Sequence, residues 1–248
     1  TYEKLVNSVF AIWANIIPER SWAASFNCAY FLSGGFDDRP GMGKYFIHYH
    51  WVTGGFGGMN GRDGRSGATP IYGAGLANQS IEQKERQWPV TLQLMAHKTD
   101  SMGAGKWRGG CGFDTEIRFD NKDGVTLAYV SDRGRNGPGG PPGLFGGKRG
   151  IYQGSVHNPG QPNEKWLDVV FKDVHAAKGD VVNHYTQGGG GYGDPLERNP
   201  YQVLEDVKDE FVSLNKARED YGVVLEVIDP EILHYAIDEV ATVALRRK

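Results

Sequence analysis

The spacing of apolar residues predicts a helix at the beginning of the chain. Within 2–17 the apolar residues recur every three or four positions, at Leu5, Val9, Ile12 and Ile16. Pro18 ends this pattern, as proline does when it cannot continue a helix. The next stretch, 21–40, is small and aromatic and contains Ser33-Gly34-Gly35, so we expect an irregular connection there.

Alternating apolar and polar positions predict a series of strands through the middle of the chain. The predicted strands are 44–53, 89–97, 113–119, 125–130, 151–156, 166–171 and 180–186. The sequence DNKDG lies between the third and the fourth of these strands and is typical of a β-hairpin, so we expect those two to pair. A short charged stretch, 81–87, is expected to form a helical turn.

Helical spacing returns only after residue 195. We expect helices at 202–210 and 213–221, the second ended by Gly222, and then an edge strand at 223–228. Asp229 and Pro230 suit the first positions of a last helix. The apolar face of that helix would be Leu233, Ala236, Ile237, Val240 and Ala244.

These elements predict an α+β protein: a β-rich body with long glycine-rich loops, an N-terminal helix and C-terminal helices. We expect the β-rich core to occupy 1–195 and a helical segment, 196–248, to pack on it. The chain has 36 glycines, about twice the usual share of roughly 7%. They are concentrated in loops at 54–67, 100–112 and 134–150 and in the run Gly188–Gly191.

The glycine run is the stretch around which the chain is arranged. Four consecutive glycines predict positive φ angles and close packing at a domain or subunit seam. Gly188, Gly190 and Gly193 also satisfy the dinucleotide pattern G-x-G-x-x-G. That interpretation is disfavoured, because two helical segments follow instead of a βαβ unit.

Charge and hydropathy exclude several classes of partner. The net charge is −3, which gives no electrostatic reason to expect nucleic acid or an anionic membrane as partner. The chain contains no run of 18 apolar residues. Two cysteines, Cys28 and Cys111, do not make a disulfide framework, so we expect reduced thiols in a soluble, cytoplasmic protein.

Two glycine loops carry charged residues suited to chemistry. Arg62 and Asp63 would provide acid–base groups, or else an exposed salt bridge in a turn. In the second loop, Asp100 and Ser101 precede Lys106 and Arg108 among glycines. Successive backbone N–H groups there would form an anion-binding nest, and a simple strand connection with solvated charges is the alternative.

Other candidate groups are less complete. His48 and His50 lie two apart on a predicted strand, a spacing that can bind Zn or Mn, but no third ligand is evident and a polar strand face is the favoured explanation. Glu82 and Glu85 share a face of the predicted turn, as in a solvated surface. Cys111 has no adjacent histidine. No Walker A sequence is present.

The chain resembles the C-terminal portion of the hydantoinase B/oxoprolinase family. The resemblance rests on motifs that occur in family order: GGFGGMNGRDG, IEQKERQWP, DSMGAGKWRGGCG, PPGLFGGKRG and GDVVNHYTQGGGGYGDPLERNPYQVLEDVKDEFVSLNKAREDYGVV. These motifs span nearly the whole chain. It departs from the family only at Met102, which replaces a small residue, and at the variable positions Trp107 and Cys111.

The resemblance implies a subunit of an ATP-dependent hydrolase of cyclic amides such as hydantoin, 5-oxoproline or lactams. The family also includes the acetone and acetophenone carboxylases, so a subunit of an ATP-dependent ketone carboxylase is an alternative. A non-catalytic structural or assembly subunit is another. The small-molecule substrate would then meet Asp63, Arg62 and Asp100 as catalytic groups, with Ser101, Lys106 and Arg108 binding substrate or an anion.

The resemblance also implies partners and cofactors. The expected partners are a hydantoinase A-like subunit, which binds ATP in an actin-like fold, and the N-terminal half of a hydantoinase B-like protein. The family's metal ligands lie in that half, which has no counterpart here. We therefore expect ATP and a divalent metal (Zn or Mn) to be bound elsewhere in the complex and not by this chain. Leu144 and Phe145 are the predicted contact with a partner.

Overall fold

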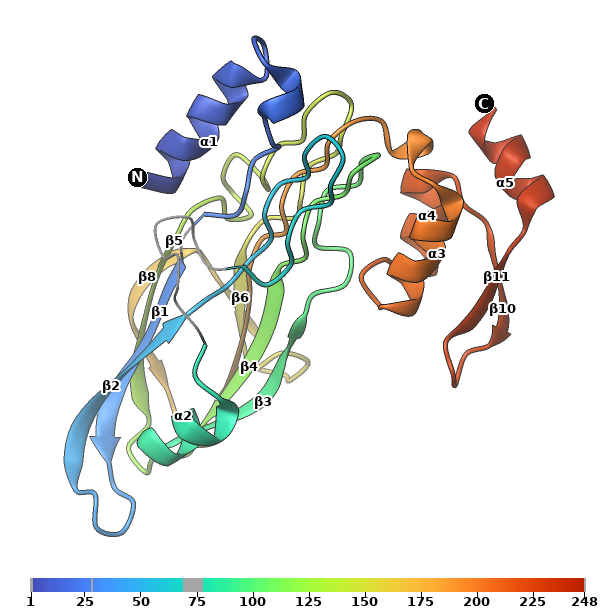
Figure 1. Cartoon of the computed structure of the whole chain (residues 1–248). Helices are drawn as coiled ribbons and strands as arrows, with labels where there is room; N and C mark the ends of the chain where they lie inside the picture. The colour runs from blue at the N-terminus through green and yellow to red at the C-terminus, as the bar shows by residue number, and fades with distance from the viewer. Residues whose placement is uncertain (1, 28, 69–77, 248) are drawn as a thin grey trace.

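The chain folds as two antiparallel sheets packed face to face, with glycine-rich segments at one end (Figure 1). The computed structural model describes residues 2–27, 29–68 and 78–247, so Cys28 lies outside the described residues. The order in the four-stranded sheet is β2-β1-β5-β8, and in the five-stranded sheet β3-β4-β9-β6-β7. Helices lie at both ends of the chain, so the predicted α+β class is confirmed.

The bounds of the strands agree in most places with the alternating pattern. The first sheet contains β1 (Ala29–Asp37), β2 (Lys44–Trp51), β5 (Val125–Ser131) and β8 (Val170–Ala176). The second contains β3 (Val90–His97), β4 (Phe113–Phe119), β6 (Gly154–His157), β7 (Lys165–Leu167) and β9 (Val181–Tyr185). A hydrophobic core shared by both sheets includes Phe31, Ile117, Leu127 and Val182, which are all fully buried.

Three predictions in this body are wrong. The predicted strand 166–171 is divided between β7 and β8, which belong to different sheets. The stretch 21–40 is not irregular throughout, because β1 runs through Gly34 and Gly35. A Cβ on Gly35 would lie 2.9 Å from the carbonyl oxygen of Gly124, so glycine there admits the neighbouring loop. The predicted hairpin is also absent: β4 pairs with β3 and β9, while β5 pairs with β1 and β8. The connection crosses between the sheets because Phe119 and Val125 both enter the shared core.

The glycine-rich segments form a bundle of extended chains, here called the glycine bundle: 22–26, 54–58, 101–112, 140–150 and 186–193. The run Gly188–Gly191 is buried within it. The N–H groups of Gly189, Gly190 and Gly191 donate to the carbonyls of Gly110, Ala24 and Lys148, each at 2.9 Å. Successive N–H groups therefore bond to three different segments, as expected for a backbone with three residues per turn.

Close packing, and not the φ angle, explains the glycine run. A Cβ added at Gly189 would lie 2.0 Å from the carbonyl oxygen of Phe56, and one at Gly191 would lie 2.0 Å from that of Ala104. The expectation of positive φ is wrong for 188–191, whereas Gly193 does have a φ of 75°. Only glycine fits where backbones pack this closely.

The N-terminal helix α1 (Tyr2–Trp13) presents its apolar side outward. Glu3 and Asn7 are buried against the body, while Leu5 and Ile12 are about 60% exposed, at 62% and 61%. The helix is followed by a 3-10 turn, η1 (Pro18–Arg20). A second short helix, α2 (Ile81–Gln87), confirms the predicted helical turn, and Ser80 caps it by accepting a bond from the N–H of Gln83.

The C-terminal segment packs on the glycine bundle on the side away from α1 (Figure 1). It comprises η3 (Pro195–Glu197), α3 (Pro200–Lys208), α4 (Leu214–Tyr221), β10 (Leu225–Asp229), β11 (His234–Ile237) and α5 (Glu239–Arg246). The predicted last helix from Pro230 is wrong in its first part, because β11 pairs with β10 as a hairpin. Asp238, not Asp229, caps the helix that follows. In the part of the chain that the structure describes, no helix has the length and apolar character needed to cross a bilayer.

Candidate functional site

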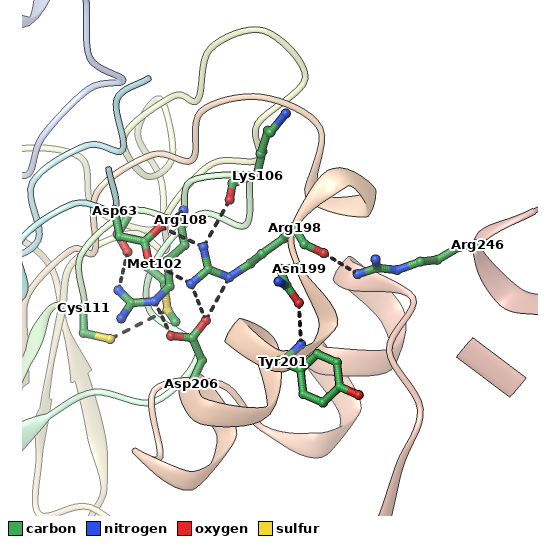
Figure 2. A network of polar contacts seen from close by, with 11 residues as sticks. Asp63, Met102, Lys106, Arg108, Cys111, Arg198, Asn199, Tyr201, Asp206 and Arg246 are labelled. Carbon is green, nitrogen blue, oxygen red and sulfur yellow. Dashed lines mark hydrogen bonds and ion pairs between the residues drawn. The ribbon is translucent and has the colours of Figure 1, made fainter. Parts of the chain in front are cut away.

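Two arginines and two aspartates form a buried network where α3 meets the glycine bundle (Figure 2). Asp63 and Arg108 come from glycine loops, and Arg198 and Asp206 from the C-terminal segment. Asn199 caps α3 by accepting from the N–H of Tyr201 and so places Arg198 just before the helix. Asp206 lies on the buried face of α3 with Val203 and Val207.

Arg198 is the centre of this network. Its Nη1 and Nη2 donate to the two carboxylate oxygens of Asp63 at 2.7 and 2.8 Å. Its Nε and Nη2 donate to Asp206 Oδ2 at 3.0 and 2.7 Å. Arg108 Nε completes the set by donating to Asp206 Oδ1 at 2.7 Å. The four formal charges cancel, and planar guanidinium forks satisfy the carboxylate oxygens.

Burial makes these interactions strong. The side chains of Arg198, Asp206 and Arg108 are 2%, 7% and 9% exposed. Burial by itself would lower the pKa of Arg198, but the hydrogen bond to Asp63 and the charge of Asp206 outweigh it and raise the pKa. For Arg108, likewise, burial lowers the pKa, but the charges of Asp206 and Asp63 outweigh burial and the pKa is raised. Both guanidiniums therefore stay charged.

A hollow of about 420 Å³ lies against the other side of Asp63. Its lining is Trp22, Phe56, Gly57, Met59, Arg62, Asp63, Gly64 and Arg65. Arg62 and Arg65 are exposed, and Arg62 Nη2 lies 3.2 Å from the sulfur of Met59. The hollow thus combines aromatic walls with two cations and one carboxylate, which suits a small polar molecule with acceptor oxygens.

The structure brings together some of the predicted site residues and separates others. Asp63 and Arg108 are adjacent, since the N–H of Arg108 donates to Asp63 Oδ1 at 2.9 Å. Arg62 lines the hollow beside them. Lys106 directs its ammonium outward to Glu197 at 2.9 Å. Its carbonyl accepts from Arg198.

Asp100 and Ser101 lie apart from this hollow, at the attachment of the C-terminal segment. Asp100, with a φ of 58°, accepts from the N–H of Ser213 at 2.8 Å. Ser101 Oγ donates to the carbonyl of Lys98 and accepts from the N–H of Gly112. These groups have partners within the chain, and their predicted roles in catalysis and anion binding stay predictions.

Sequence reasoning did not select Arg198 or Asp206 as site residues. A signal for Asp206 was present, because it falls three residues after Val203 and one before Val207 on an otherwise apolar helix face. A carboxylate on such a face needs a buried cation, which the pattern alone does not name. Arg198 lies before the helix start and carries no periodic signal.

The histidines of β2 point into the core between the sheets. His48 and His50 are joined there by His184 of β9, with ring centroids 5.7 Å apart for the first pair and 5.2 Å for His50 and His184. Burial lowers the pKa of His48 to about 3 and that of His184 to about 4. Lys84, also buried, reaches within 3.4 Å of His50 Nδ1. Among the described residues, no three His, Cys, Asp or Glu side chains are placed to hold a metal ion.

Two further candidates have ordinary structural surroundings. Burial raises the pKa of the Cys111 thiol to about 11, and its sulfur lies 3.7 Å from that of Met102. A thiol of this kind is a poor nucleophile at neutral pH. Glu85 accepts from the N–H of Leu92 at 2.9 Å, whereas Glu82 is exposed, so the two do not form a pair.

The fold is shared with two solved enzymes. An acetone carboxylase in its nucleotide-free structure aligns with a TM-score of 0.80 and 22% identity, over 95% of this chain and 34% of the other. An ATP-dependent caprolactamase from Pseudomonas jessenii aligns with a TM-score of 0.76 and 27% identity, over 95% of this chain and 40% of the other. The chain therefore has the architecture of one part of such larger enzymes.

The family follows from the sequence comparison. A model of the hydantoinase B/oxoprolinase family matches residues 1–195, and the chain belongs to that family. The caprolactamase subunit beta of Pseudomonas jessenii is 30% identical over 233 residues, which are 90% of this chain and 39% of the relative. The chain spans about a third to two fifths of the length of the first curated relatives it matches.

Proposed function

We propose that this chain is part of an ATP-dependent enzyme that hydrolyses a cyclic amide of the hydantoin, 5-oxoproline or lactam type. The observation that supports this most is the similarity to the caprolactamase, which extends over 95% of the chain in fold and 90% in sequence. In such a reaction ATP would supply the phosphoryl group that makes the amide oxygen a leaving group. This chain would contribute binding and positioning of the substrate.

Within this proposal the hollow beside Asp63 is the part of the chain that meets substrate. Arg62 and Arg65 supply donors for carbonyl or carboxylate oxygens, and Trp22 and Phe56 supply an apolar wall. Both oxygens of Asp63 already accept hydrogen bonds from Arg198. Asp63 therefore holds the loop in place and orients a substrate donor, while proton transfer by it would require part of the ion pair to open.

The remaining machinery is provided by partners in this proposal. A divalent Zn or Mn would be held by these partners in this proposal. An ATP-binding, hydantoinase A-like subunit would supply the nucleotide site. The outward apolar side of α1, with Leu5 and Ile12, is the proposed contact with the further part of the B-type protein that the longer relatives contain.

The test measures ADP release by the assembled complex with hydantoin, 5-oxoproline, caprolactam and acetone as separate substrates. We expect turnover with at least one cyclic amide and without bicarbonate. Turnover of acetone that depends on bicarbonate would instead identify a ketone carboxylase, the alternative for which the acetone carboxylase fold is the reason. If none of these four substrates causes ADP release, both the hydrolase and the carboxylase assignments are contradicted.

The role of the hollow is tested with matched variants of that complex. Arg62→Ala and Arg65→Ala remove exposed cations without touching the buried network, so thermal stability should be unchanged. We expect a rise in KM of at least tenfold for one of them. Lys172→Ala, which removes an exposed cation of β8 outside the hollow, is the control. If all three leave kcat and KM within about threefold, less than ~1 kcal/mol, the hollow does not bind substrate and the chain acts as an assembly subunit.

A further inference from the structure

A second cavity, of about 730 Å³, lies between α1, the end of β5 and the glycine bundle. One wall is the inward side of α1, with Lys4, Asn7 and Ala11. Other walls are apolar and come from Pro138, Pro142, Leu144 and Val169. Among the described residues, only Trp22 lines both this cavity and the hollow beside Asp63.

Three buried hydrogen-bond donors of the residues that line this cavity have no partner in the described part of the chain. They are the side-chain amide Nδ2 of Asn27, the indole Nε1 of Trp22 and the guanidinium Nε of Arg133. Leaving a buried donor unpaired costs about 1–3 kcal/mol each. All three are donors and none is an acceptor, so the group that would satisfy them carries acceptor oxygens.

The orientation of the Asn27 amide follows from its neighbours. Asn7 Oδ1 accepts from the N–H of Ser25 at 2.9 Å, and Asn7 Nδ2 donates to the carbonyl of Ser25 at 3.1 Å. These backbone bonds fix which end of the Asn7 amide is nitrogen. Asn7 Nδ2 also donates to Asn27 Oδ1 at 3.2 Å, so the other end of the fully buried Asn27 amide is the free NH₂.

Arg133 brings positive charge, and the nearby carboxylate of Asp132 is shared with Lys4. Lys4 is paired with Asp132 at 2.6 Å. Arg133 and Arg149 donate to the same neutral acceptor, the carbonyl of Gly140, at 3.4 and 3.1 Å. Burial lowers the pKa of Arg133, the charge of Arg149 lowers it further, and the charge of Asp132 offsets part of this. An anion beside Arg133 would offset both effects.

Two carboxylates also line the cavity, Asp132, which is paired with Lys4, and Asp168. Asp168 is exposed, and its Oδ1 accepts from the N–H of Val169 at 2.7 Å. Arg133, which lines the cavity, has a φ of 60°, a backbone conformation that favours glycine. A residue held in such a conformation costs of order 1–3 kcal/mol and persists where its surroundings fix it.

We propose that this cavity binds a small organic carboxylate. Its oxygens would accept from Arg133 Nε and Asn27 Nδ2, and its carbon skeleton would lie against the proline and leucine walls. A guanidinium paired with a neutral amide donor is an arrangement suited to a carboxylate group. This site goes beyond the hydrolase proposal, because occupation needs neither ATP nor turnover.

The test measures binding of benzoate and of benzamide, which have the same shape but differ in charge, by saturation-transfer NMR and calorimetry on the purified protein. We expect benzoate to bind at least tenfold more tightly than benzamide. Arg133→Met removes the cation, and Asn27→Asp keeps the oxygen that Asn7 needs but replaces the free donor by a negative oxygen. Each variant should weaken benzoate binding at least tenfold.

Arg118→Met, which changes a half-exposed arginine on β4 away from the cavity, is the control and should bind benzoate as the wild type does. Melting curves establish that each protein is folded. Equal binding of benzoate and benzamide, absence of benzoate binding by the folded wild type, or unchanged binding by Arg133→Met would each overturn the proposal. If Asn27→Asp does not fold, the remaining comparisons still decide it.

Discussion

Arg198 and Asp206 are charged residues that join the C-terminal helices to the glycine loops. Arg198 joins Asp63 of a glycine loop to Asp206 of α3, and Arg108 reaches the same Asp206 from another loop. When one partner of a buried ion pair is removed, the other charge remains in a poorly solvated place. Removing one member of this network is therefore expected to destabilise the chain far more than breaking one of its exposed ion pairs.

Asp206→Asn should destabilise the protein by about 3–5 kcal/mol, because Arg198 and Arg108 would both lose a charged acceptor. Urea unfolding followed by circular dichroism measures the change. The matched control is Lys106→Met, which breaks the exposed pair with Glu197 and should change stability by less than about 1 kcal/mol. Equal effects of the two substitutions would show that the buried network is not a strong tie.

The buried histidines should make stability depend on pH. In the folded chain the pKa is lowered to about 3 for His48 and about 4 for His184, and that of His50 is also well below 6.5. The unfolded chain thus binds more protons below pH 6.5, so stability is fully present above that pH and is lost as the pH falls. Each histidine contributes a slope of roughly 1.4 kcal/mol per pH unit in this window.

Urea midpoints at pH 7.5 and 5.5 check this expectation, above the range in which most carboxylates titrate. The wild type should be markedly less stable at pH 5.5. His184→Gln should reduce the difference, whereas His234→Gln, at an exposed position of β11, should leave it unchanged. A midpoint that does not move between the two pH values would show that the histidines are solvated or protonated in the folded chain.

Among the secondary-structure elements, the strands follow the hydrophobic pattern and the glycine segments do not. Alternation located β3, β4 and β9 because each has one side in the shared core. It missed β1, whose glycines look like a break in the sequence although they admit a neighbouring loop. The pairing of β4 and β5 was mispredicted because the turn sequence is local, whereas the choice of sheet depends on distant strands.

The candidate site shows the same division between local and distant information. Asp63 and Arg108 were chosen because charged residues in glycine loops are unusual, and the structure does bring them together. Asp100 and Lys106 were chosen on the same ground, but their side chains have partners elsewhere in the chain. Predicting the role of Arg198 requires knowing which loop faces the start of α3, and no spacing in the sequence provides that information.

Gly189→Ala should disrupt the glycine bundle, because the added methyl carbon would lie 2.0 Å from a backbone carbonyl that cannot rotate away. We expect a loss of at least about 3 kcal/mol, and insoluble protein for Gly190→Val. Thermal melting and soluble yield are the measurements. Gly34→Ala is the control, since its methyl would meet the nearest atom at 3.4 Å. Wild-type melting of Gly189→Ala would show that the bundle is loosely packed.

For the whole molecule, the exposed apolar groups indicate where further protein is expected. The predicted contact at Leu144 and Phe145 is only partly available, because Leu144 is half-buried while Phe145 is 51% exposed and packs edge-on against Tyr192. The outward side of α1 exposes more large apolar side chains than the Leu144–Phe145 tip does. Burying a Leu or Ile side chain contributes about 1.5–3 kcal/mol, so this face should be covered in the assembled enzyme.

Leu5→Lys combined with Ile12→Lys should leave the melting temperature of the isolated chain nearly unchanged, since both side chains face solvent. The same double variant should abolish co-elution with the further part of the B-type protein in size-exclusion chromatography. Lys substitutions at Tyr45 and Ile47, exposed on β2, are the control and should not affect co-elution.

The isolated chain should hydrolyse neither ATP nor an amide. Robust ATPase activity from it would contradict the proposal that partner subunits supply the nucleotide site.

The central position of Gly188–Gly191 has a consequence for how the protein is made on the ribosome. The segments that donate to or accept from this run begin near residue 22, but the run itself is not synthesised until some 165 residues later. Earlier glycine segments can bond to one another, but their bonds to Gly188–Gly191 must wait for that run, and closing such long loops slows folding. We expect pulse-labelled hydrogen exchange to protect amides of β1 and β2 first and those of Gly58 and Gly103 last; simultaneous protection would show that the bundle does not wait for its centre.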